Sequence, residues 1–333
     1  MAFIISGDGK RDAKAYDAAA GTGGPILHVE YTGCKEYYGY FDPTARYSYA
    51  NSRFYRDSSG DWDGNFLNWL TMRRIDVARK VMMGGLANPR TTTGTQKLTG
   101  ENAPSNRTFI KEYDGTNTLD GSGGAGVTPY DDDTYSYVVD TGEFTVKQGN
   151  TTKATYSIVV EKVAADEPND FEDLGAGPTT VGVFQRYGNQ ARWGNMWFNN
   201  NGDDSKNNGN GGFISNPITD NITSNFINDL QNTAADTWTP LAEAYYTAVM
   251  YYAQDAIDGS LNYSNNPGTT ANDPYDNAAY CAKSFVIIVT DGASTMDGKI
   301  PSSIIDYADA YDDFVAGDHV AGACNESTGS GCE

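Results

Sequence analysis

The chain has 333 residues, enough for one large domain or two, and its 44 acidic side chains outnumber its 23 Lys and Arg, giving a net charge of −21. A charge this negative repels phosphate backbones and anionic membrane surfaces, so it argues against nucleic-acid binding. The chain is 39% hydrophobic and 12% aromatic. It can therefore bury a substantial core, and global disorder is also excluded.

Composition and cysteine usage favour an extracellular protein. The polar segments are rich in Asn, Gly, Asp, Thr, Ser and Tyr, a composition common on secreted surfaces. The four cysteines lack zinc-site spacing, so we expect disulfides; of three possible connectivities we favour Cys324 with Cys332 and Cys34 with Cys281, the alternative being four free thiols. No segment reaches the about 20 apolar residues of a membrane span. The first six residues are too short for a signal peptide, so we expect that the chain lacks its beginning.

The sequence of the first half of the chain predicts three segments. Residues 1–62 predict an irregular, aromatic and Gly-rich segment with a strand-like piece at 26–29. An amphipathic helix is predicted from Asn65 onward, ended by Gly84 and Gly85, on the spacing of Leu67, Leu70, Ile75, Ala78 and Met82. Residues 88–175 predict an inserted β subdomain, with strands at 107–113, 135–139, 143–147 and 155–163.

The second half predicts alternating helices and strands. We expect helices at 181–190, 223–231, 240–254 and 302–314 and strands at 192–198, 212–218 and 284–290. The apolar run Phe285–Val289 is typical of a strand buried on both faces of a parallel sheet. The predicted fold is thus α/β, a doubly wound and mostly parallel sheet formed by residues 63–87 and 176–333 and interrupted by the β subdomain.

Two oxygen-bearing residues follow elements of this predicted sheet. Ligands bind at the carboxyl edge of such sheets, where Asp291 follows the apolar strand and opens into Gly292. Its carboxylate could hold a hard cation or simply cap the turn. Thr239, before Pro240, could start a helix or face a metal with its hydroxyl. Together they suggest a metal-ion-dependent adhesion site.

Several stretches of the chain resemble the N-terminal region of the PilY family of type IV pilus tip-associated proteins. These are Tyr37–Pro43, Gly64–Trp69 running into Met72–Lys80, Trp238–Glu243, and Phe285–Gly292. The resemblance implies a von Willebrand factor A-like core with a metal site made by an Asp-x-Ser-x-Ser loop after the first strand, a Thr and an Asp. By position, the Thr is Thr239 and the Asp is Asp291.

The Asp-x-Ser-x-Ser loop itself is absent from the chain. Asp57–Asp61 superficially resembles it, but no apolar strand precedes this stretch, and a ligand loop must be fixed by a buried strand. We expect the first strand and the motif to lie upstream of Met1. The full-length parent could then bind Mg²⁺ or Ca²⁺, whereas two oxygen ligands here would hold neither tightly.

Weaker motifs do not indicate catalysis. Asn199–Asn210 and Asp131–Asp133 favour solvated loops over Ca²⁺ sites, and Gly292–Ile300 departs from the P-loop spacing. His28 and His319 lie beside no obvious nucleophile, and there is no G-x-S-x-G motif. We therefore expect a protein that is not an enzyme.

These observations and the resemblance together favour a non-enzymatic adhesion and assembly component of a type IV pilus tip. We expect an extracellular, pilus-associated location and contacts with minor pilins or the tip complex and with a surface or host ligand. Two alternatives remain: a purely structural scaffold or filament subunit, and a secreted carbohydrate-active protein. The sequence leaves open the partner's identity, the disulfide connectivity, the oligomeric state and the role of the β insertion.

Overall fold

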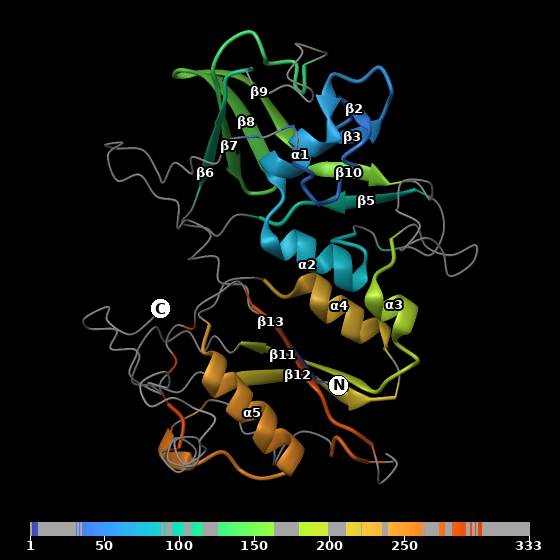
Figure 1. Ribbon diagram of the computed structural model, residues 1–333, viewed down its shortest axis with the longest axis vertical. Helices are drawn as coiled ribbons and strands as arrows, with labels where there is room; N and C mark the ends of the chain where they lie inside the picture. The colour runs from blue at the N-terminus through green and yellow to red at the C-terminus, as the bar shows by residue number, and fades with distance from the viewer. Residues whose placement is uncertain are drawn as a thin grey trace. The chain divides into compact units, whose positions relative to one another are not determined.

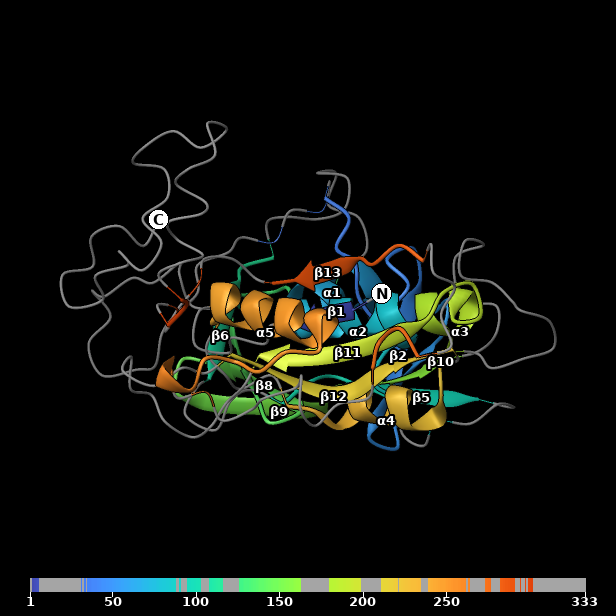
Figure 2. The same ribbon diagram turned by 90° about the horizontal axis from the view of Figure 1, so that it is seen from below.

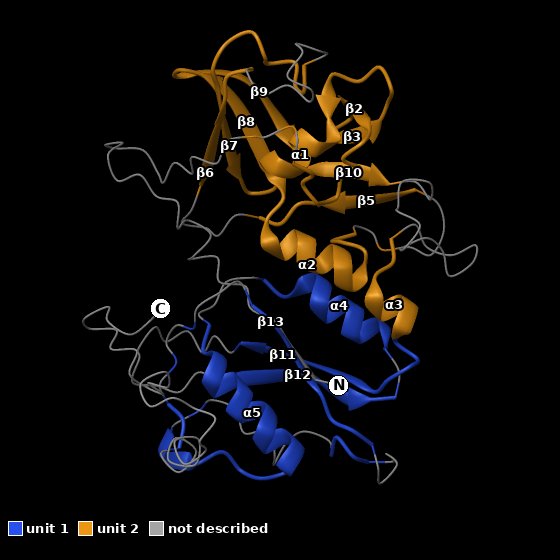
Figure 3. Ribbon diagram, in the orientation of Figure 1, with its two compact units in different colours: residues 1–10, 188–333 blue, residues 11–187 orange. Residues whose placement is uncertain are grey.

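A computed structural model of the chain divides it into two compact units (Figures 1 and 3). Unit 1 comprises residues 1–10 and 188–333, and unit 2 comprises residues 11–187. The structure describes residues 2–5, 31, 33, 35–87, 90, 95–102, 108–115, 126–162, 180–198, 211–220, 222–234, 239–261, 263, 273–276, 282–290, 294, 297 and 299–301. The three-segment division predicted from sequence, with boundaries at 62, 87 and 175, does not coincide with these units and stays a prediction about domains.

Unit 2 contains two sheets. The five-stranded sheet has the order β4-β2-β3-β10-β5, and only its β3–β10 pair is parallel. Its strands are β2 (Arg46–Ala50), β3 (Arg53–Arg56), β4 (Trp62–Asp63), β5 (Gln96–Thr99) and β10 (Val159–Lys162). The second sheet is an antiparallel meander of β6 (Phe109–Tyr113), β7 (Tyr135–Asp140), β8 (Glu143–Gln148) and β9 (Thr151–Ser157). The β-rich character predicted for residues 88–175 is thus present in their described part.

The helix predicted from Asn65 is two helices, α1 (Gly64–Thr71) and α2 (Arg74–Met83). Met72 and Arg73 between them are extended, and the Asp76 carboxylate accepts the Arg73 N–H at 2.9 Å, which starts the second helix. Gly84 ends α2 with φ 83°, as its sequence position predicted. A Cβ there would lie 2.4 Å from the Thr180 backbone, so a side chain would not fit. A short helix, α3 (Val183–Tyr187), completes the unit.

The core of unit 2 is built largely from aromatic rings. Phe54 is fully buried, and its ring centroid lies 4.8–6.1 Å from those of five other aromatic side chains: Phe41, Tyr49, Trp62, Phe144 and Tyr156. Edge-to-face and stacked pairs at these distances stabilise a core beyond the area they bury. The Gly- and Tyr-rich segment that read as irregular therefore contributes strands and core, because its rings alternate inward from β2 and β3.

Unit 1 contains one mixed sheet with the order β12-β11-β1-β13 (Figures 1 and 2). Strand β1 (Ala2–Ile5) pairs in parallel with β11 (Trp193–Phe198) and β13 (Val286–Val289), whereas β12 (Gly212–Thr219) is antiparallel to β11. The helices are α4 (Ser224–Asn232), α5 (Leu241–Ala253) and a 3₁₀ turn, η2 (Gly259–Leu261). None of the helices in the described part of the chain could cross a bilayer.

The predicted doubly wound, mostly parallel von Willebrand factor A-like sheet is wrong. The described sheets are mixed or antiparallel: β12 reverses direction against β11, and unit 2 has a single parallel pair among its strands. Parallel neighbours need long crossovers, usually helical, whereas β12 runs antiparallel to β11, the strand that precedes it in the chain. The alternation of predicted element types therefore did not determine strand direction.

Two further expectations about this sheet are corrected. The first strand was expected upstream of Met1, but β1 occupies the centre of the sheet, between β11 and β13. The strand predicted to be buried on both faces, β13, lies at the sheet edge, and its Ile287 and Ile288 are 38% and 37% exposed. An apolar run thus marked an edge strand here, and the residues that follow β1 lie outside the described residues.

Candidate functional site

The predicted metal ligand Thr239 lies buried directly before α5. The helix cap falls on Pro240, one residue later than predicted. Asp291, the second predicted ligand, lies outside the described residues, as do the four cysteines, His28, His319, residues 199–210 and the helix predicted at 302–314. The pairing of Thr239 with Asp291, and both disulfides, stay predictions.

The amino end of α5 is capped by a carboxylate that sequence reasoning missed. Asp297 Oδ2 accepts the Ala242 N–H at 2.7 Å, and Oδ1 accepts the Glu243 N–H at 3.0 Å. Burial raises the pKa of Asp297, although these amide donors act in the opposite direction. The free N–H groups and positive dipole end of the helix are therefore occupied by an anion from the chain itself.

Glu243 adds a second, fully buried carboxylate to this end of α5. Its Oε2 accepts the Gly211 N–H and its Oε1 the Lys299 N–H, both at 3.0 Å. Burial and then the charges of Glu243 and Asp297 raise the pKa of Tyr263 well above its ordinary value, and the Tyr263 hydroxyl donates to the Lys299 carbonyl. We name Glu243 and Asp297 the α5 carboxylate pair.

The geometry of this pair favours a structural role. Each carboxylate accepts two backbone N–H groups, which fixes the start of β12 and the segment around Lys299 against α5. Within the described ranges, no group of three or more His, Cys, Asp or Glu side chains is placed to hold a metal ion. Carboxylate oxygens are cation ligands in principle, but a metal would compete here with existing hydrogen bonds.

A second polar centre joins α4 to the sheet of unit 1. The Asp229 carboxylate accepts four hydrogen bonds, from Asn195 Nδ2 at 2.6 Å, Trp197 Nε1 at 2.9 Å, Ser215 Oγ at 2.6 Å and Asn216 Nδ2 at 3.2 Å. The charge is fully engaged by neutral donors, so this centre locks the helix onto the strands. The sequence signal was the position of Asp229 beside buried Leu230 and one turn after buried Phe226.

The family-like stretches of unit 2 lie against one another. Asn68 Oδ1 accepts the Phe41 N–H at 3.0 Å, and its Nδ2 donates to the Tyr37 and Phe41 carbonyls at 2.8 Å. Asn65 acts similarly, with Oδ1 accepting the Tyr37 N–H at 2.6 Å and Nδ2 donating to the Lys35 carbonyl at 2.8 Å. We call these two amides the α1 amide brace. Both satisfy the backbone of an irregular segment that has no strand partner.

The third family-like stretch, Met72–Lys80, contains buried charged side chains close to this brace. Lys80 Nζ donates to the Gly39 carbonyl at 2.7 Å and lies 4.4 Å from the Tyr38 ring centroid. Asp76 is fully buried and accepts the Arg73 and Glu101 N–H groups. Burial raises the pKa of Asp76 from 3.8 to about 6, against the lowering effect of these donors and of nearby arginines.

The acidic motifs set aside as loops serve local turns. Asp57 accepts hydrogen bonds from Ser48 Oγ at 2.7 Å and from the N–H and hydroxyl of Ser59 at 3.0 and 2.8 Å. Asp133 accepts the Thr134 N–H at 2.7 Å. Such contacts of an Asp with its following residues are turn chemistry, so the resemblance of Asp57–Asp61 to a metal motif is superficial.

Unit 2 thus has an aromatic core and an amide-braced segment, and part of its sequence is similar to that of known proteins. Residues 28–162 match the family model described as the PilY1 homolog, small alpha/beta domain. The type IV pilus biogenesis factor PilY1 homolog of Xylella fastidiosa (strain Temecula1 / ATCC 700964) is 33% identical over 123 residues, covering 33% of this chain and 8% of that protein. No solved structure matches the chain.

These matches confirm the resemblance to the PilY family over residues 28–162. The matched range lies within unit 2 and includes the α1 amide brace and the aromatic core. The region expected to form a von Willebrand factor A-like domain, 176–333, lies outside it. The alignment spans a small part of the Xylella protein, so what that whole protein does is not transferred by the match.

Proposed function

We propose that this chain is a non-enzymatic component of the type IV pilus machinery, acting in pilus assembly and in adhesion at the pilus tip. The observation that carries the proposal is the family match of residues 28–162, together with the fold that these residues build. A pilus-associated location at the cell surface and contacts with pilus components follow from the same proposal. Minor pilins are the partners we propose first, and a surface or host molecule second.

The chemistry of the described residues supports binding as the main activity. The carboxylates of the α5 pair and of Asp229 are engaged by backbone or side-chain donors, an arrangement that stabilises the fold. Large apolar side chains meanwhile remain exposed on unit 1. Phe213, Tyr245, Tyr275 and Phe285 are 43–54% exposed. Exposed aromatic side chains are typical of protein-binding surfaces.

The proposal on metals is narrower. We propose that Mg²⁺ or Ca²⁺ binds only weakly, with Thr239 and Asp291 contributing oxygen ligands. The residues near Thr239 support weak binding at most, because the oxygens of Glu243 and Asp297 already accept backbone N–H groups.

Gene replacement tests the proposed function. In the organism that encodes this chain, we expect deletion of the gene to lower the number of surface pili and the attachment of cells, and the intact gene to restore both. The product of the gene should co-purify with minor pilins. Unchanged piliation and attachment in the deletion strain would contradict the proposal, as would a gene product that binds no pilus component.

A further inference from the structure

The exposed edge of unit 1 offers backbone groups for pairing. Strand β13 is last in the sheet, and among the described residues only β1 pairs with it. Exposed edge strands are usually protected by Lys, Pro or a bulge, but β13 reads Val286-Ile287-Ile288-Val289 and has none of these. Val286 packs toward α5, whereas Ile287 and Ile288 are more than a third exposed. This edge is suited to accept another strand.

A cavity of about 300 Å³ lies at the beginning of the same strand. Its lining comes from five segments of unit 1: residues 190–192 before β11, Ile218 of β12, Tyr252 of α5, the turn with Tyr275, and residues 282–285 before β13. Ile218 is 5% exposed, whereas Phe285 and Tyr275 are 54% and 43% exposed. The cavity therefore has a buried apolar floor and aromatic walls open to solvent.

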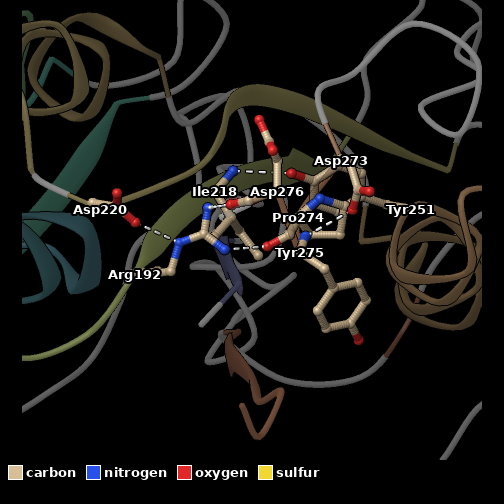
Figure 4. A network of polar contacts seen from close by, with 8 residues as sticks. All are labelled: Arg192, Ile218, Asp220, Tyr251, Asp273, Pro274, Tyr275 and Asp276. Atoms are coloured by element: carbon tan, nitrogen blue, oxygen red, sulfur yellow. Dashed lines mark hydrogen bonds and ion pairs between the residues drawn. The ribbon is translucent and has the colours of Figure 1, made fainter. Parts of the chain in front are cut away.

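The walls of this cavity are held in place by hydrogen bonds (Figure 4). The Arg192 guanidinium donates from Nε to Asp220 Oδ1 at 2.6 Å and from Nη2 to the Asp276 carbonyl at 2.9 Å, and it also donates to the Pro274 carbonyl. Tyr275 N–H is accepted by Asp273 Oδ1 at 2.7 Å. The turn that carries Tyr275 is thus fixed from both sides, so the cavity is formed before any ligand arrives.

The other walls are tied directly to the strand. The Tyr252 hydroxyl donates to the Phe285 carbonyl at 3.1 Å, and the hydroxyls of Tyr275 and Ser284 lie 2.8 Å apart. Lys283 is exposed at the rim, and no carboxylate of the described residues pairs with it. With no carboxylate partner among the described residues, the Lys283 cation favours an acidic group on a bound molecule.

The strand edge, the cavity and the net charge of the chain together indicate which kind of molecule binds here. Among the described residues the outer edge of β13 has no strand partner, and its regularly spaced N–H and C=O groups match the backbone of an extended peptide. The aromatic cavity at the end of the strand accommodates a large apolar side chain, as pockets beside augmented strands do. A second copy of this chain is disfavoured because two bodies of charge −21 repel each other.

We propose that β13 is a docking site for an extended peptide of a partner protein, which adds to unit 1 as a further strand. One large apolar side chain of that peptide fills the cavity between Tyr252, Tyr275 and Phe285, and a carboxylate of the peptide pairs with Lys283. This site does not depend on the proposed pilus function, because it follows from the geometry of unit 1 alone.

A peptide library displayed on phage, selected on the full chain, tests the proposal. We expect enriched peptides to combine a run of β-branched residues with one large apolar and one acidic residue. A synthetic copy of an enriched peptide should bind about fivefold more weakly to the Lys283→Glu variant. Lys97→Glu, an exposed lysine change of the same charge in unit 2, should leave binding unchanged. Phe285→Ala should weaken binding while the circular dichroism spectrum stays native.

Backbone methylation of the peptide separates strand addition from side-chain contact. N-methyl groups at alternate residues block strand pairing in one register and point away from β13 in the other. We expect about tenfold weaker binding in the first register and no change in the second, the effect of losing a paired backbone hydrogen bond. The proposal is overturned if no peptide is enriched, or if enriched peptides bind equally well in both registers and to Lys283→Glu.

Discussion

Phe54 and Phe285 show how differently the two units use the same residue type. Phe54 in unit 2 is fully buried among five aromatic rings, whereas Phe285 in unit 1 is 54% exposed beside an open cavity. The aromatic side chains of unit 2 thus stabilise its core, whereas several aromatic side chains of unit 1 are exposed and available to other molecules. We infer that the family-specific sequence of unit 2 is mainly a folding requirement and that partner contacts are to be sought on unit 1.

Replacing each of the two phenylalanines with alanine should give the largest difference in stability between the units. Phe54→Ala leaves a cavity in the aromatic core, and we expect it to lower the free energy of unfolding of unit 2 by about 3–5 kcal/mol. Phe285→Ala removes an exposed ring and should cost less than about 1 kcal/mol. Urea unfolding of the full chain, followed by hydrogen exchange and mass spectrometry, resolves the units. Equal costs for the two variants would contradict the comparison.

Removing the amide of Asn68 should have the next largest effect. Asn68→Leu keeps the size of the side chain but leaves the Phe41 N–H and the Tyr37 and Phe41 carbonyls without their partner. We expect a loss of about 3 kcal/mol in unit 2, because buried backbone groups without partners are costly. Asn102→Leu, at an exposed position of the same unit, is the control and should be near neutral. A near-neutral Asn68→Leu would show that the brace does not stabilise the fold.

Asp76 should make the stability of unit 2 depend on pH. Its pKa is raised from 3.8 to about 6 in the fold, so between these values the folded state holds a proton that the unfolded state has released. The free energy of unfolding should therefore fall as pH rises from about 4 to about 6, by about 3 kcal/mol in total. In Asp76→Asn this contribution disappears, so the difference between the two proteins should change with pH over that window. A difference independent of pH would refute the assignment.

Replacing Asp297 should destabilise only the start of α5, and by less than the changes described above. Asp297→Ala leaves the Ala242 and Glu243 N–H groups at the start of α5 without an acceptor, which should cost about 1 kcal/mol, as for other helix caps. Asp297→Asn keeps one acceptor oxygen, so its loss of stability should lie between zero and that of Asp297→Ala. Amide exchange over residues 241–244 is the readout, and unchanged protection in Asp297→Ala would argue against the cap.

The smallest effect is expected from added metal. Since Glu243 and Asp297 are engaged by backbone donors, titration calorimetry of this chain with Mg²⁺ should show no tight binding. Micromolar affinity that is lost on Asp291→Ala would contradict this expectation and establish the predicted Thr239–Asp291 site.

Local signals in the sequence were more informative than long-range ones. Gly84 ended its helix as predicted, and the strands at 109–113, 135–140 and 143–148 lie close to their predicted ranges. The break at Met72 was missed because it depends on a cap from Asp76, and the four-residue strand β1 was missed because its pairing partners lie about 190 and 280 residues away. The apolar pattern of β13 carried no information on whether a neighbour would cover it.

The candidate site was predictable only in part. Thr239 lies one residue before the helix cap for which it was predicted. The surroundings of this helix start depend on Asp297, Gly211 and Lys299, which come together only in the folded chain. The cavity at Phe285 likewise combines five separate segments. No spacing rule connects residues that far apart, whereas the PilY resemblance was readable because its motifs are contiguous.

Hydrogen exchange of the full chain with and without purified minor pilins tests the division of roles most directly. The account predicts that pilins increase protection in unit 1, at Ser284–Val289, and leave Tyr37–Lys80 of unit 2 unchanged. Protection confined to Tyr37–Lys80, with none at Ser284–Val289, would contradict it.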